Sequence, residues 1–324
     1  MNLRSLQRNI PFLATLVVCV ALYAAAAFKY EGFASLRVLI NFLGDNSFLG
    51  ITALGLTFVI LSGGIDLSVG AVIGLVSVFL ALALEKWHLH AAVAIPLALF
   101  AGSLFGAAMG ALIQQFALPP FLVTLGGMFF ARGLAYLLSL ESLPITHYLE
   151  GINNNLHIPL GALDVPATAI ILMIVFVVTF VVAHYTRFGR AIYAIGGNEQ
   201  SATLMGLPVA RTKIAVYALS GFCSALAGVV YCLYTQSGNP NAGSGLELDA
   251  IAAVVIGGTL LSGGVGYVAG TIVGVLIFGI IQTAIVFQGT LSSWWTKIVI
   301  GALLLAFILL QKLIQAKKFV VKKG

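Results

Sequence analysis

Charged residues are scarce in this sequence. Only 8% of the 324 residues are Asp, Glu, Lys or Arg, whereas soluble domains carry roughly 25%. Hydrophobic residues make up 60% of this sequence. No charged residue occurs between Lys213 and Glu247, or between Asp249 and Lys297. A helix needs about 20 apolar residues to cross ~30 Å of hydrocarbon, and only helices or closed barrels satisfy their backbone there. Barrel-type alternation is missing, so composition predicts an all-α, polytopic transmembrane bundle.

Catalytic motifs are missing as well. The sequence contains no G-x-x-x-x-G-K-[ST] loop for nucleotide phosphates and no H-E-x-x-H for zinc. The His-x-His at 88–90 is interpreted as a solvated turn, and the three cysteines fall in predicted spans as small apolar residues. We therefore expect no enzyme activity, no metal and no cofactor bound by this chain.

Apolar segments predict about ten spans. The first can also be read as a secretory signal peptide, but its length favours an uncleaved helix. No soluble domain or linker is visible, so residues 1–324 are expected to form a single transmembrane domain. The predicted spans are 10–28, 43–62, 65–84, 91–114, 118–138, 165–186, 213–236, 247–262, 265–288 and 293–311.

The distribution of basic residues predicts the orientation, because cytoplasmic loops collect Lys and Arg. With the N-terminus inside, cytoplasmic segments hold eleven of the sixteen basic residues, and the outside loop 139–164 holds none. Both termini, including the basic tail 312–324, are therefore expected in the cytoplasm. The net charge of +6 is explained by orientation and by contact with anionic lipid, and it does not indicate nucleic-acid binding.

A glycine motif occurs twice, as "LSGGIDLSVG" at 61–70 and "LSGGVGYVAG" at 261–270. Glycine pairs that interrupt short apolar segments are one indication of a transporter's binding region. Two interpretations of Asp66 are open: it caps the helix that follows the glycine turn, or it lies with Ser68 on a translocation path or gate. The second copy lacks the Asp, which fits either interpretation.

Three further charged residues lie near predicted spans. Arg132 is the basic residue well inside an apolar segment, where it pairs with an acidic group or extends toward an interface. Glu247 and Asp249 precede a short helix. They either cap that helix or form the mouth of a permeation path.

The loop 187–211 is the longest predicted cytoplasmic segment. It contains "NEQSATLMG", which predicts a short helix that begins at Asn198 and ends at Gly206. A short helix between basic ends suits docking to another protein. A solvated surface helix is the alternative.

Three motifs, "VILSGGIDLSVG", "TRFGRAIYAIGGNEQSATLMGLPV" and "ELDAIAAVVIGGTLLSGGVG", resemble the permeases of ribose-type ABC sugar importers over essentially the whole chain. The segments "RVLINFLGDNSFLGI", "TQSG" and "GTLSSWWTKI" resemble, more closely still, permeases of bacterial galactofuranose importers. The resemblance implies a bacterial inner-membrane subunit that imports a monosaccharide delivered by a periplasmic binding protein.

The resemblance also implies partners and a coupling site. A cytoplasmic ABC ATPase would bind ATP and Mg²⁺ and contact loop 187–211, and a second permease, a paralogue in the galactofuranose-type systems, would complete the pore. The coupling residues expected in this chain are Arg190, Gly196, Gly197, Asn198, Glu199 and Gly206. The alternatives are an ion-coupled carrier, which the scarcity of mid-membrane charges disfavours, a branched-chain amino-acid permease, and a membrane enzyme.

Overall fold

The structure is a computed structural model that describes residues 3–146, 158–160, 163–290, 292 and 294–321. Helices make up nearly all of it, which confirms the predicted all-α class, and the strands are only two or three residues long. In chain order the elements are α1 (Leu3–Lys29), α2 (Leu36–Asp45), α3 (Ser47–Leu61), α4 (Val69–Ala81) with a π-helical end (Leu82–Lys86), α5 (Ala91–Gln115), α6 (Pro120–Leu138), β1 (Leu143–Pro144), β2 (Ile158–Leu160), β3 (Leu163–Val165), α8 (Ala167–Tyr185), α9 (Arg187–Gly197), α10 (Glu199–Leu204), α11 (Val209–Thr235), β4 (Ser237–Gly238), α12 (Leu246–Ile256), α13 (Val268–Gln288) and α14 (Trp294–Val321).

Among the described residues, seven helices are long and apolar enough to cross a membrane. An eighth is counted if α2 and α3, which meet at 60°, form one bent span. Two of the ten predicted spans are too short to be counted in this way. α12 has 11 residues and extends about 16 Å, and the apolar part of α14 is Trp294–Leu309.

The bend between α2 and α3 interrupts the predicted span 43–62 at Asn46. Two side chains at the bend bond to carbonyl oxygens of the preceding turn: Asn46 Nδ2 to Phe42 O at 3.0 Å, and Ser47 Oγ to Gly44 O at 2.7 Å. Such bonds compete with the regular helix and change its direction. The helical part of this region begins at Leu36, ahead of the predicted start at residue 43.

α11 occupies the centre of the bundle, where it packs against α5, α3 and α4. The closest approach is between α5 and α11, because Gly102 and Gly106 of α5 face the backbone of Gly221 and Tyr217. Small residues allow such approach, on which helix association in lipid depends. α1 lies at the edge of the bundle and packs mainly on α13.

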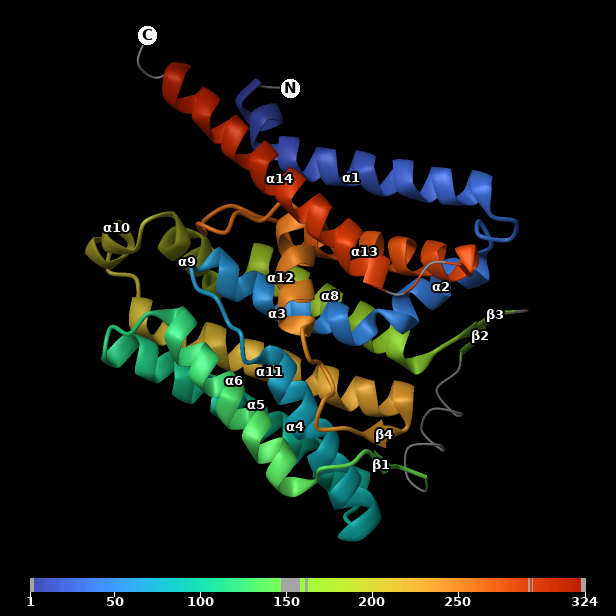
Figure 1. Cartoon of the computed structure of the whole chain (residues 1–324). Coiled ribbons are helices and arrows are strands. Elements are labelled where there is room, and N and C mark those ends of the chain that lie inside the picture. The colour runs from blue at the N-terminus through green and yellow to red at the C-terminus, as the bar shows by residue number, and fades with distance from the viewer. Residues whose placement is uncertain (1–2, 147–157, 161–162, 291, 293, 322–324) are drawn as a thin grey trace.

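The two ends of the bundle differ (Figure 1). The start of α1, the end of α14, and α9 with α10 all lie toward one end, on the left of the view. The two small antiparallel pairs lie toward the other end. There, Leu143 of β1 pairs with Gly238 of β4, and Ile158 of β2 pairs with Val165 of β3. The first end is called the α9–α10 end below.

Candidate functional site

The two copies of the glycine motif meet at the α9–α10 end. Gly63 and Gly263, at the same position in each copy, both have positive φ, +83° and +80°, a conformation that glycine adopts without strain. The carbonyl oxygen of Leu61 accepts a hydrogen bond from the N–H of Gly264 at 2.9 Å. The motifs are therefore two halves of one junction, which we call the glycine junction: residues 61–64 and 261–264.

Asp66 follows the junction and is fully buried. Its Oδ1 accepts bonds from the N–H and hydroxyl of Ser68, at 2.9 and 2.6 Å, and its Oδ2 accepts one from Ser220 Oγ at 2.7 Å. Ser68 immediately precedes α4. The carboxylate thus holds the start of α4 and joins it to α11. Sequence reasoning had not singled out Ser220. A serine in the middle of an apolar span was the available clue.

The predicted short helix is confirmed as α10. Asn198 is its N-cap and accepts a bond from Ser201 N–H at 2.8 Å, and Gly206 follows its end with φ +76°. Glu199 forms a 2.6 Å ion pair with Lys213 of α11. The exposed Arg190 lies on α9.

Gly196, at the end of α9, is pressed against the glycine junction. A β-carbon built on it would overlap Leu61 O and lie 2.5 Å from Gly264 N, whereas one built on Gly197 would meet nothing within 4 Å. Tyr193 of α9 donates a bond to Gly266 O at 3.0 Å. Burial raises the pKa of Tyr193 to about 12, so its hydroxyl remains a donor at neutral pH.

A small polar cavity lies at the glycine junction. It is bounded by both serines of the motifs, by the Glu199–Lys213 pair and by Tyr217, whose hydroxyl lies 3.4 Å from Ile65 O. Residues of α9, α10, α11 and the glycine junction therefore meet around this cavity.

The other candidate residues lie in two places. Arg132 donates from Nη1 to Pro240 O and to Ala242 O, the latter at 2.8 Å, and does not form an ion pair with Glu247 within 4 Å. Asp249 instead forms an ion pair with Lys297 of α14. The structure therefore brings Arg132 and Glu247 to the segment 239–247 and directs Asp249 to a different helix.

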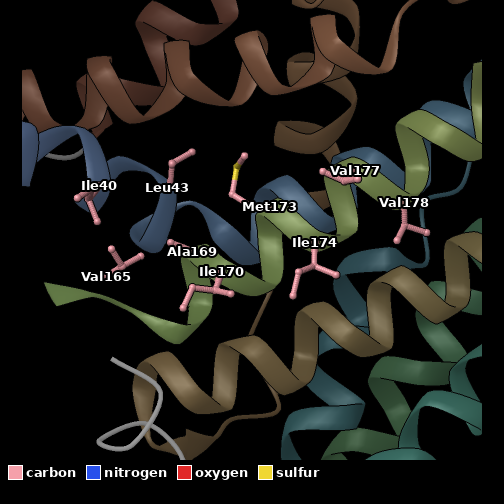
Figure 2. Close-up of a pocket in the computed structure, with 9 residues that line it drawn as sticks. All are labelled: Ile40, Leu43, Val165, Ala169, Ile170, Met173, Ile174, Val177 and Val178. Carbon is pink, nitrogen blue, oxygen red and sulfur yellow. The ribbon is translucent and has the colours of Figure 1, made fainter. Parts of the chain in front are cut away.

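A groove between α2 and α8 is lined only by apolar side chains (Figure 2). Side chains of α2 and α8 face each other across it, and every residue that bounds it is apolar. A sugar site needs polar groups that fix the ligand, so this groove suits lipid acyl chains. Its residues are Ile40, Leu43, Val165, Ala169, Ile170, Met173, Ile174, Val177 and Val178.

Interrupted apolar helices around a buried polar junction, with a short helical element at one end, are the features expected of a membrane transport permease. Residues 38–308 match the family described as the permease component of branched-chain amino acid transport systems, and the chain belongs to this family. No solved structure matches the chain.

Curated relatives are similar over almost the whole chain. The inner membrane ABC transporter permease protein YjfF of Escherichia coli K12 is 53% identical over 95% of this chain and 93% of its own. The fructose import permease protein FruG of Bifidobacterium longum is 39% identical over 96% and 93%, and the ribose import permease protein RbsC of E. coli K12 is 36% identical over 91% and 92%. These relatives confirm the resemblance to ribose-type ABC sugar permeases.

Proposed function

We propose that this chain is the membrane-spanning permease subunit of an ATP-driven, binding-protein-dependent monosaccharide importer of the bacterial inner membrane. The relatives named for ribose and fructose support a sugar over a branched-chain amino acid. The resemblance to galactofuranose-type permeases makes galactofuranose the first sugar to test, before other pentoses and hexoses.

The observation that carries this proposal is the exposed tip of the α9–α10 end. Leu204 and Met205 are 89% and 68% exposed at the end of α10, which lies toward the same end of the bundle as the start of α1 and the end of α14 (Figure 1). Exposed large apolar side chains outside the lipid suit a protein interface. We assign this tip, with Arg190, Gly196, Gly197, Asn198, Glu199 and Gly206 behind it, to the docking and coupling of a cytoplasmic ATPase that holds ATP and Mg²⁺.

The proposed topology has ten passages with both termini in the cytoplasm. α12 lies in one passage together with segment 239–245, and α4 lies in another together with residues 62–68. This orientation places the basic ends of α9 and α14 on the cytoplasmic side, as the distribution of Lys and Arg favours. A single cysteine at Ser201 should react with an impermeant thiol reagent only from the cytoplasmic side, and one at Glu141 only from the outside. The opposite pattern would invert the assignment.

A second permease subunit, expected to be a paralogue, would cover the polar face formed by segment 239–247. Asn241 and Ser244 are exposed there, and exposed polar groups at membrane depth face protein or water rather than lipid. We place Arg132, Glu247 and Asp249 beside the path between the two subunits. Asp66 and Ser68, which hold the chain after the glycine junction, are placed at the cytoplasmic gate.

The test of function is uptake of labelled sugars into vesicles that contain this chain, its partner permease, the ATPase and the binding protein. Galactofuranose, ribose, xylose and galactose are compared with and without internal ATP, and with the proton gradient collapsed. We expect uptake that needs ATP and the binding protein and survives the collapse. Uptake by this chain alone that stops with the gradient would show an ion-coupled carrier instead.

A further inference from the structure

Three side chains from two helices fix the segment that leads into α12. Arg132 of α6 binds the carbonyl groups of Pro240 and Ala242. Tyr136, one turn further along α6, donates to Asn241 Oδ1. Ser77 of α4 both donates to the carbonyl and accepts from the N–H of Asn239, at 3.1 Å each.

This polar cluster lies within the depth of the membrane. Arg132 is twelve residues from the start of the nineteen-residue α6, or roughly 18 Å along a helix of about 28 Å. The loop carbonyls that it binds would have no water to accept from in lipid. The cluster therefore positions the segment that leads into α12. This role explains the hydrogen bonds of Arg132 Nη1 but not the other N–H groups of the guanidinium.

Hydrogen-bonding capacity remains after that positioning. Arg132 uses only Nη1 for its two bonds within the described residues, and a guanidinium has five N–H donors. Glu247 Oε2 is buried and accepts no hydrogen bond in that same part of the chain. N–H donors of Arg132 and one oxygen of Glu247 therefore remain without a partner in the described residues, near the segment that carries the exposed Asn241 and Ser244.

We propose that Arg132, Glu247 and Asn241, with the ring of Tyr136, form a contact site for the hydroxyl groups of the sugar as it crosses the membrane. This proposal rests on the proposed function. Sugar hydroxyls both donate and accept, which fits the remaining guanidinium N–H groups and, once segment 239–247 moves to uncover it, the buried Glu247 Oε2. The half-buried ring of Tyr136 provides apolar surface for the face of the sugar ring. Such a contact orients the sugar in passing, since the binding protein delivers it.

The first test asks whether sugar reaches the site. In the reconstituted complex, Ser244→Cys should react with an impermeant thiol reagent, and sugar delivered by the binding protein should slow the reaction at least about twofold. Val177→Cys, in the apolar groove of Figure 2, is the control and should not react. The native Cys223 and Cys232 are buried, and the partly exposed Cys19 is replaced by Ser in both variants to keep the background low. No labelling of Ser244→Cys, or labelling that sugar leaves unchanged, would overturn the proposal.

The second test asks whether the side chains distinguish sugars. Glu247→Gln and Asn241→Ala are compared with wild type for uptake of two sugars that differ in the configuration of one hydroxyl. We expect uptake to fall about fivefold or more, unequally for the two sugars, while the binding protein still stimulates ATP hydrolysis. An equal fall for both sugars, or no fall, would contradict a contact role. Failure of the proposed function is distinguishable, because wild-type uptake would then not need ATP.

Discussion

A substitution at Gly196 is the sharpest test of how the proposed ATPase docking site is coupled to the glycine junction. In Gly196→Ala the new methyl group would lie 2.5 Å from Gly264 N and 2.9 Å from the carbonyl carbon of Leu61, whereas ordinary contact begins at 3.4 Å. Backbone atoms cannot rotate away, so α9 or the glycine junction must move by roughly 1 Å, an overpacking that costs about 1–3 kcal/mol. The new methyl group would press on both partners of the hydrogen bond from Gly264 N–H to Leu61 O, which contributes about 0.5–1.5 kcal/mol.

A shift of about 1–2 kcal/mol changes the ratio of two conformations by a factor of about 5–30. We therefore expect Gly196→Ala to assemble with its ATPase but to transport sugar about 5- to 30-fold more slowly per ATP hydrolysed. The assay measures uptake and ATP hydrolysis in the same proteoliposomes. Gly126→Ala on α6 is the control, because its methyl group would meet nothing within 4 Å and Gly126 lies outside the proposed docking site. Wild-type transport by Gly196→Ala, or equal loss in both variants, would refute the reasoning.

Three further variants test the connections around the junction. Asp66→Ala leaves the two donors of Ser68 and the hydroxyl of Ser220 without their acceptor. It should lower the free energy of unfolding by about 1–3 kcal/mol, more than Ser220→Ala does. Equal thermal unfolding of the two variants in detergent would contradict this. In a double-mutant cycle that measures the stability of the transporter complex, Glu199→Gln and Lys213→Met should show a coupling energy of only about 0.2–1 kcal/mol, because the ion pair is partly exposed. The coupling energy should fall at high salt, and one that salt does not change would show that the pair is buried in the complex. Tyr193→Phe should reduce uptake per ATP without loss of ATPase binding, and a variant that instead loses ATPase binding would place Tyr193 in the docking surface.

Local features were predictable from the sequence where the cause is local. The Asn198 cap and the Gly206 end of α10 follow from residue type at a helix boundary, and the structure confirms both. The all-α class followed from the apolar runs. The residues proposed for docking were selected from the family resemblance, and their role still awaits the experiments above.

Long-range features were not predictable. The bend at Asn46 depends on side chains that bond back to Phe42 and Gly44, and no apolar pattern indicates it. The partners of Arg132, at Pro240 and Ala242, are more than a hundred residues away and are backbone carbonyls, which every residue has. The two sequence-based interpretations of Arg132, an acidic partner or extension toward an interface, did not include the backbone carbonyl oxygens that it binds.

The two glycine motifs differ for a reason that only the packed structure shows. Position 66 holds an Asp and the corresponding position 266 a Gly. At Gly266 a β-carbon would lie 2.6 Å from Thr259 Cγ2 and 2.8 Å from Thr259 Cβ, so no side chain fits. The first copy is therefore anchored through a carboxylate, to Ser220 of α11, and the second through the carbonyl of Gly266, to Tyr193 of α9. One half of the junction is fixed to the central helix and the other to the helix leading to the exposed tip. Gly196 of α9 packs on both Leu61 and Gly264, so we expect motion of α9 to reach both halves, of which only the first is anchored to α11.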